Sequence, residues 1–282
     1  MQTKPIHFLF LFFIAVLLSC NNQESNTSAE TKQSSDSTQN AIAVKEEAVA
    51  YDAGGTTLKG YVAYDEKRTG RRPIILVVPE WWGLTDYPRM RAKMLAEMGY
   101  FAMAVDMYGD GKIAGNPKDA QSAAMPFYTD PQMSKQRLDA ALAKAKTFAQ
   151  ADTSQAVAIG YCFGGSMVLN YAKMGAPVAG VVSFHGGLEG VPPQKGTKAQ
   201  FLILHGGADS FVPQSQVDAF RKSMDSAGLA YNVKVYDSAT HAFTNPDATM
   251  KGQEFNMPIK YNGAADTASW NDMKAFLGRI LH

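Results

Sequence analysis

The sequence has almost no net charge and little cysteine. Its 27 Lys and Arg balance 26 Asp and Glu to a formal net charge of +1, and two of its 282 residues are Cys. Without a visible basic excess, a nucleic-acid partner is not expected. The sequence also lacks a metal-ligand cluster, a phosphate-binding loop and a dinucleotide fingerprint, so we expect neither a metal nor a cofactor.

Long hydrophobic runs are scarce as well. The apolar run at 8–18 has eleven residues, whereas an ordinary transmembrane helix needs about 20. A run of this length fits the hydrophobic region of a secretory signal peptide. It leads into Leu17-Leu18-Ser19-Cys20, which resembles a bacterial lipobox with Cys20 as the lipidated first residue of the mature protein. The alternative is an ordinary cleaved signal that happens to contain a Cys.

Residues 21–41 are rich in Ser, Thr, Asn and Gln. Such a composition cannot bury enough apolar surface to offset the entropy of ordering, which predicts a disordered tether. We therefore expect a signal peptide at 1–19, a lipidated Cys20 and tether at 20–41, and a folded domain at 42–282. This layout is typical of an exported bacterial lipoprotein, anchored to a membrane in the periplasm or at the cell surface. If Cys20 carries lipid, Cys162 is alone in the mature domain and no disulfide can form within it.

The folded part alternates between strand-like and helix-like segments, with a hydrophobic content of 46% that suffices for a substantial core. Predicted strands lie at 44–50, 57–64, 73–78, 101–105, 156–159, 178–184, 201–205 and 231–236, the first two as an antiparallel pair. Predicted helices lie at 88–98, 135–149, 166–173, 215–227 and 265–281. This alternation predicts a single α/β domain with a mostly parallel central sheet and helices on both faces. We see no internal repeat and expect a monomer rather than an oligomer.

The run Gly160-Tyr161-Cys162-Phe163-Gly164-Gly165 lies between a predicted strand and a predicted helix. Strand, glycine-flanked turn and helix form the pattern of a nucleophile elbow, here with Cys in place of Ser. The glycines let strand and helix approach without Cβ clashes, and the dipole of the following helix favours a thiolate. A buried, inert Cys is the commoner fate of a lone thiol, but this position favours a nucleophile.

A thiol nucleophile needs a base and a group that orients the base. On this kind of sheet an acid and then a His follow the nucleophile in the chain. Asp209 follows a predicted strand in a glycine-rich loop, where turn chemistry is the alternative role. His241 follows the last predicted strand and has the expected order, whereas His185 and His205 are interpreted as structural residues at strand ends. We expect His241 to take and return the proton and Asp209 to fix its tautomer.

Two backbone N–H groups are predicted to form an oxyanion hole. One belongs to Phe163, directly after the nucleophile, and the other to Trp81, which follows the first buried strand. Glu80 ends that strand beside Trp81 and Trp82, so it either sits partly buried close to the nucleophile or reaches water.

Together these segments resemble the dienelactone hydrolase family. The resemblance rests on the run around Cys162, on Pro79-Glu80-Trp81-Trp82-Gly83-Leu84, on Val105-Asp106-Met107-Tyr108-Gly109, on His205-Gly206-Gly207-Ala208-Asp209 and on Thr240-His241-Ala242-Phe243. It covers nearly everything from about residue 45 onward. It implies a single α/β-hydrolase domain and a Cys162–His241–Asp209 triad, with Glu80 near the thiol and able to influence its ionisation.

The sequence departs from the family pattern at two places. Members that act on dienelactone have an arginine after the Asp-x-Tyr motif and another a few residues past the catalytic His, and both hold the substrate carboxylate. Here Gly109-Asp110-Gly111 and Thr244-Asn245-Pro246 occupy these stretches without an Arg. A carboxylate buried without a charged partner is strongly disfavoured. We therefore expect a small neutral ester, lactone or acyl-sugar, in a pocket shaped by Trp81, Trp82 and Tyr108.

The sequence as a whole predicts a hydrolase that forms an acyl-enzyme on Cys162 and needs no cofactor. The alternative is a catalytically idle, hydrolase-fold binding lipoprotein on the cell surface, against which the presence of all three triad residues argues. A peptidase on this fold would need an added lid or propeller domain, and the chain has no room for one.

Overall fold

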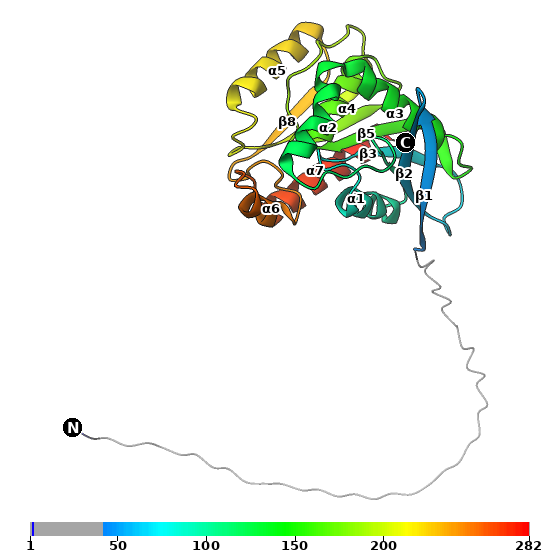
Figure 1. Ribbon diagram of the computed structural model, residues 1–282, viewed down its shortest axis with the longest axis horizontal. Coiled ribbons are helices and arrows are strands. Elements are labelled where there is room, and N and C mark those ends of the chain that lie inside the picture. Colours follow the sequence, from blue (N-terminus) through cyan, green and yellow to red (C-terminus); the bar gives the residue numbers. More distant parts are fainter. Residues whose placement is uncertain (1, 3–41, 282) are drawn as a thin grey trace, which may run out of the picture. The chain divides into compact units, whose positions relative to one another are not determined.

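The sheet at the centre of the domain is mostly parallel. The computed structural model describes residues 2 and 42–281, so the predicted signal peptide, Cys20 and the tether lie outside the described residues. Within 42–281 eight strands form one sheet, in the order β1-β2-β4-β3-β5-β6-β7-β8. Its strands are β1 (Val44–Ala53), β2 (Thr56–Asp65), β3 (Arg72–Val78), β4 (Phe101–Ala104), β5 (Ala151–Tyr161), β6 (Gly180–Phe184), β7 (Gln200–Gly206) and β8 (Tyr231–Tyr236). Only the pairs β1–β2 and β2–β4 are antiparallel. Strands β1 and β2 lie side by side at one edge of the sheet (Figure 1).

The helices are α1 (Asp86–Glu97), α2 (Pro117–Thr129), α3 (Pro131–Ala145), α4 (Phe163–Lys173), α5 (Gln214–Ala227), α6 (Ala248–Glu254) and α7 (Gly263–Ile280). The sequence patterns missed α2 and α6 and placed α3 four residues too late. Pro126 interrupts the helical pattern inside α2, and α6 is a short helix that contains Gly252. A single residue, Asp130, separates α2 from α3 and caps α3 by accepting the N–H of Gln132. Among the described residues, no helix is both long and apolar enough to cross a membrane.

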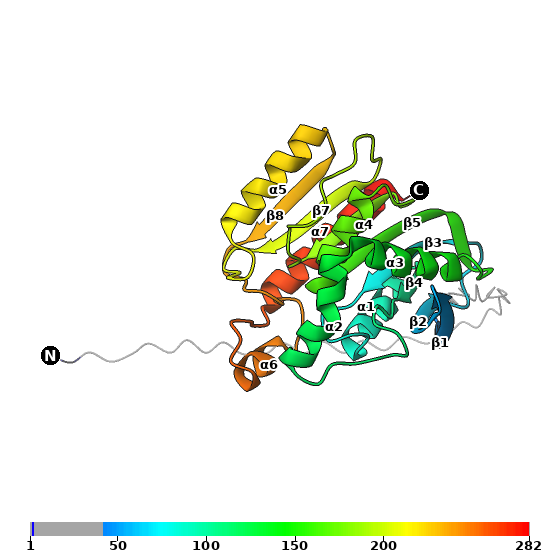
Figure 2. The ribbon, with the colours of Figure 1, turned by 45° about the horizontal axis from the view of Figure 1, so that its top comes forward.

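Both faces of the sheet are covered by helices. Alternate residues of β3 point to opposite faces: Ile74, Leu76 and Val78 belong to the core cluster under α3, α4 and α5. Ile75 and Val77 belong to the cluster under α1 and α7, which lie on the other side of the sheet (Figure 2). The predicted fold class is therefore confirmed: an α/β domain whose central strands are buried on both sides.

The turn between β5 and α4 brings strand and helix unusually close. Cys162, at the turn, has φ 52° and ψ −115°, a left-handed conformation that costs about 1–3 kcal/mol for a residue with a side chain. A Cβ at Gly160 would lie 2.1 Å from the Gly164 carbonyl oxygen, and a Cβ at Gly164 would lie 2.3 Å from the Val78 carbonyl oxygen. Only glycine fits at both positions, as the elbow pattern predicts.

This close approach makes a testable prediction for Gly164→Ala. The added methyl group has no room, so the variant should lose about 1–3 kcal/mol of its free energy of unfolding, measured by denaturant titration. Gly278→Ala is the matched control, because it also lies in a helix but has no atom within 4 Å of its would-be Cβ. Alanine there should stabilise by about 0.5–1 kcal/mol. Similar effects of both substitutions would contradict the packing argument.

Candidate active site

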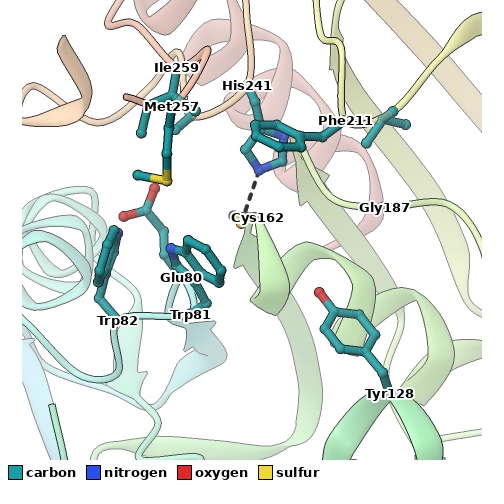
Figure 3. Close-up of a pocket in the computed structure, with 12 residues that line it drawn as sticks. Glu80, Trp81, Trp82, Tyr128, Cys162, Gly187, Phe211, His241, Met257 and Ile259 are labelled. Atoms are coloured by element: carbon teal, nitrogen blue, oxygen red, sulfur yellow. Dashed lines mark hydrogen bonds between the residues drawn. The ribbon is translucent and has the colours of Figure 1, made fainter. Parts of the chain in front are cut away.

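A cavity of about 230 Å³ opens where loops after several parallel strands meet, and Cys162 lies on its wall. Most of its other walls are aromatic or aliphatic: Trp81, Trp82, Tyr128, Phe211, Met257 and Ile259. Figure 3 shows these side chains around the Cys162 sulfur, with His241 above it and Glu80 to one side. The residues that line the cavity include no Lys or Arg.

Cys162, His241 and Asp209 form a hydrogen-bonded chain. The Cys162 Sγ lies 3.0 Å from His241 Nε2, and His241 Nδ1 lies 2.8 Å from Asp209 Oδ2 (Figure 3 shows the first contact). The other carboxylate oxygen, Oδ1, accepts the backbone N–H groups of Phe211 and Val212 at 2.9 and 3.2 Å. Asp209 is thus held rigidly, with one oxygen free to accept the Nδ1–H of His241. The structure brings together the three residues that the sequence nominated.

The electrostatics of this chain favour a charged imidazole. Burial alone would lower the pKa of His241, but the charge of Cys162, hydrogen bonds to Asp209 and Cys162, and the Asp209 charge together raise it to about 10. An imidazolium at neutral pH is the form that pairs with a thiolate.

The predicted oxyanion donors lie on segments that are bonded to each other. Phe163 begins α4, so its N–H has no acceptor within the helix. The next N–H, of Gly164, donates to the carbonyl of Pro79 at 3.0 Å and ties α4 to the segment that carries Trp81. Among residues 42–281, no hydrogen bond occupies the backbone N–H of Phe163 or of Trp81. Trp81 lines the cavity, whereas Phe163 is absent from its lining and adjoins Cys162 in the chain.

Tyr108 supports this segment from behind. Its hydroxyl donates to the Trp81 carbonyl at 2.8 Å, and its ring packs against those of Phe127 and Phe163. It is absent from the residues that line the cavity. Its influence on the pocket is indirect, through the peptide that carries the Trp81 carbonyl.

Glu80 is buried, with 4% of its surface exposed, so the water-exposed alternative is wrong. Its Oε2 accepts a hydrogen bond from Asn245 Nδ2 at 2.6 Å. Burial raises the pKa of Glu80, against the opposing effects of the Asn245 hydrogen bond and the charges of Lys251 and His241. Glu80 shares the cavity wall with Cys162, but its hydrogen bond goes to Asn245 and not to the thiol.

Sequence reasoning missed four of the aromatic and aliphatic wall residues. Tyr128 comes from α2 and Phe211 from the segment before α5, whereas Met257 and Ile259 follow α6. Three of these positions depend on helices that the sequence patterns did not predict. The stretch without arginine after His241 is also part of the site, since Asn245 binds Glu80.

No cluster of three or more His, Cys, Asp or Glu side chains in the described part of the chain could hold a metal ion. The polar groups in the cavity wall are instead arranged around one sulfur. A nucleophile beside a base, two free N–H groups and an apolar cavity are the parts that acyl transfer needs.

Comparison with known proteins gives matches along most of the domain. A model of the dienelactone hydrolase family matches residues 58–281. A protein of Methylorubrum extorquens that carries the name of a carboxymethylenebutenolidase is 33% identical over 187 residues, which is 62% of this chain and 64% of that relative. The chain thus spans just under two thirds of that relative's own length.

Solved structures match more fully. A dienelactone hydrolase-like promiscuous phosphotriesterase from metagenomic libraries is 31% identical, with a TM-score of 0.78, over 84% of this chain and 99% of its own. A structure named m3DLH is 29% identical, with a TM-score of 0.81, over 85% of this chain and 100% of its own.

The raised pKa of His241 leads to a prediction for Cys162→Ala. The charge of Cys162 and its hydrogen bond both raise the pKa of His241, and the substitution removes both. Only Asp209 then opposes the effect of burial, so the pKa of His241 should fall well below about 10. Titration of the imidazole resonances by NMR measures this. The pKa of His205 is lowered mainly by burial and only in smaller part by the charge of His241, so the His205 resonance is the internal reference and its pKa should move far less. A His241 pKa that stays near 10 in the variant would mean that Cys162 does not hold the imidazolium.

Proposed function

Because the chain belongs to the dienelactone hydrolase family, we propose that it hydrolyses an ester or lactone bond of a small neutral substrate, with Cys162 as the nucleophile. The observation that carries this proposal is the hydrogen-bonded chain from Cys162 through His241 to Asp209 at the wall of an apolar cavity. All three groups stand in the relation that nucleophilic catalysis requires, with the base 3.0 Å from the sulfur.

Acylation begins with attack of the Cys162 thiolate on the substrate carbonyl carbon. A carbon–sulfur bond forms while the electron pair of the C=O bond moves to its oxygen. The N–H groups of Phe163 and Trp81 stabilise this oxyanion; loss of one such donor typically costs about 10²–10³ in rate. The carbon–oxygen bond of the ester then breaks, and the His241 imidazolium gives its proton to the leaving alkoxide.

Deacylation runs through the same groups. His241, now neutral, takes a proton from a water molecule whose oxygen attacks the thioester carbon. The second oxyanion collapses, the carbon–sulfur bond breaks, and the acid product leaves a thiolate beside a protonated His241. With a lactone the leaving hydroxyl stays attached to the acyl group, so one ring-opened product is released.

The neutral substrate class follows from the charges that face the cavity. No Lys or Arg lines its walls, the His241 imidazolium there is already paired with Cys162 and Asp209, and the carboxyl group of Glu80 is buried and hydrogen-bonded to Asn245. A substrate carboxylate would lose its hydration and find no Lys or Arg as an ionic partner. Trp81, Trp82 and Phe211 offer flat apolar surface in its place, which suits an uncharged acyl group.

The first prediction for this function concerns Cys162→Ala. Hydrolysis of p-nitrophenyl acetate should fall by about 10³-fold or more, on the scale seen when a nucleophile is removed. Phe220→Leu is the control: it changes an α5 side chain in the apolar core, and its rate of hydrolysis should equal that of the wild-type protein. Equal rates for the wild-type protein and Cys162→Ala would support the alternative, an idle binding protein.

A second prediction concerns substrate charge. Dienelactone and its primary amide share one ring, but only the former carries a carboxylate. The amide should have a kcat/KM at least about tenfold higher, because burial of an unpaired carboxylate costs more than the 1.4 kcal/mol that corresponds to tenfold. The rate of ring opening, monitored by absorbance, is measured for each of the two substrates. A preference for the carboxylate form would overturn the neutral substrate class.

We also propose that the protein is exported and anchored by lipid at Cys20. The support is the sequence Leu17-Leu18-Ser19-Cys20 after an apolar run, followed by a polar stretch at 21–41. The protein should incorporate labelled palmitate and sediment with membranes, and Cys20→Ala should abolish both. Retention of the label in Cys20→Ala would show that the lipid is attached to another residue and would contradict this proposal.

A further inference from the structure

His185 is the one described histidine besides His241 that touches the nucleophile. It follows β6 directly, is 1% exposed, and has a left-handed backbone with φ 43°. Its Nδ1 accepts the backbone N–H of Cys162 at 3.1 Å. The same N–H reaches the Phe184 carbonyl at 3.0 Å, so the two acceptors share it. The strained elbow residue is thus held by β6 and by an imidazole.

The hydrogen bond to Cys162 determines the tautomer of His185. Because Nδ1 accepts, the ring proton of the neutral imidazole sits on Nε2. That nitrogen lies 2.7 Å from Thr244 Oγ1, so it donates to the hydroxyl. Thr244 is three residues beyond His241 on the same loop. One imidazole therefore bridges the backbone of the nucleophile and the loop that carries the base.

The far side of Thr244 is anchored as firmly. Its hydroxyl lies 2.6 Å from the Tyr87 hydroxyl, and its carbonyl accepts a hydrogen bond from Arg91 Nη2 at 2.8 Å. Arg91 is 3% exposed and also pairs with Asp266 of α7. The loop after His241 is thereby fixed to α1 and α7 as well as to the elbow.

His185 can keep this role only as a neutral ring. Burial first, and then the positive charges of His241 and Arg91, hold its pKa well below the usual value. Its ring packs edge-on against that of His241, with 5.4 Å between centroids. It is absent from the residues that line the cavity.

We infer that His185 is a positioning residue: by joining the Cys162 N–H to the Thr244 hydroxyl, it sets the 3.0 Å contact between Cys162 Sγ and His241 Nε2. The inference rests on the proposed function of Cys162 and His241. A displacement of about 1 Å between reacting groups can cost about 10²-fold in rate. The bridge acts on that distance from outside the substrate cavity.

The test uses three substitutions in the full-length protein. His185→Leu removes both hydrogen bonds, His185→Asn keeps an acceptor in reach of the Cys162 N–H, and Thr244→Val removes the hydroxyl at nearly constant shape. His205→Leu is the control, since His205 is also a buried histidine at a strand end but its Nδ1 has no partner. Thermal unfolding establishes that each variant is folded.

Two readouts are measured: kcat and KM for p-nitrophenyl acetate, and the rate at which iodoacetamide alkylates Cys162 at pH 7. We expect His185→Leu to lower kcat and the alkylation rate by about 10²-fold with KM nearly unchanged. His185→Asn should recover part of both losses. Thr244→Val should lower both rates, and its effect should be non-additive with His185→Leu because the two residues act through one bridge.

A folded His185→Leu protein with the kcat and alkylation rate of the wild type would overturn the inference. So would a loss no larger than that of His205→Leu. If the wild-type protein hydrolyses no ester, the proposed function fails, while the alkylation comparison still decides whether His185 positions the thiol.

Discussion

The contact between β5 and α4 at Cys162 is the constraint on which the rest of the site depends. Gly160 and Gly164 leave no space for a Cβ, and the chain turns between them through a left-handed residue. Gly164 lies against the Val78 carbonyl and donates to the Pro79 carbonyl. This packing brings the start of α4 beside the end of β3. The close packing of strand and helix therefore fixes where Cys162 and the start of α4 lie relative to the end of β3.

A second requirement is electrostatic. The site places the His241 imidazolium in an apolar cavity, where an unpaired charge would be costly. Asp209, held by two backbone N–H groups, neutralises the imidazolium from behind. The pKa of Glu80 is raised, which favours its uncharged form, and the pKa of His185 is lowered, which favours the neutral ring. Both shifts limit the number of charges that are buried around the sulfur. Burial is the largest cause of both shifts.

Sequence patterns predicted much of this arrangement, because its main signals are local. Glycines around Cys162, a strand before Asp209 and the chain order of the triad residues can all be recognised without coordinates. The orientation of Tyr108 could not be predicted, since its hydroxyl binds the Trp81 carbonyl across two loops. His185 was interpreted as structural because nothing near it in the chain shows that its ring reaches Cys162 and Thr244. Tyr128 and Met257 were missed because they depend on α2 and α6, whose proline and glycine hide the helical pattern.

The central claim, that Cys162 carries the acyl group, is tested most directly by mass spectrometry of the trapped intermediate. His241→Ala removes the base that activates water, so the variant should deacylate slowly and accumulate a thioester. After incubation with p-nitrophenyl acetate and an acid quench, we expect one added acetyl group on the peptide that contains Cys162. An acetyl group on another residue, or substrate turnover with no adduct on Cys162, would contradict the account.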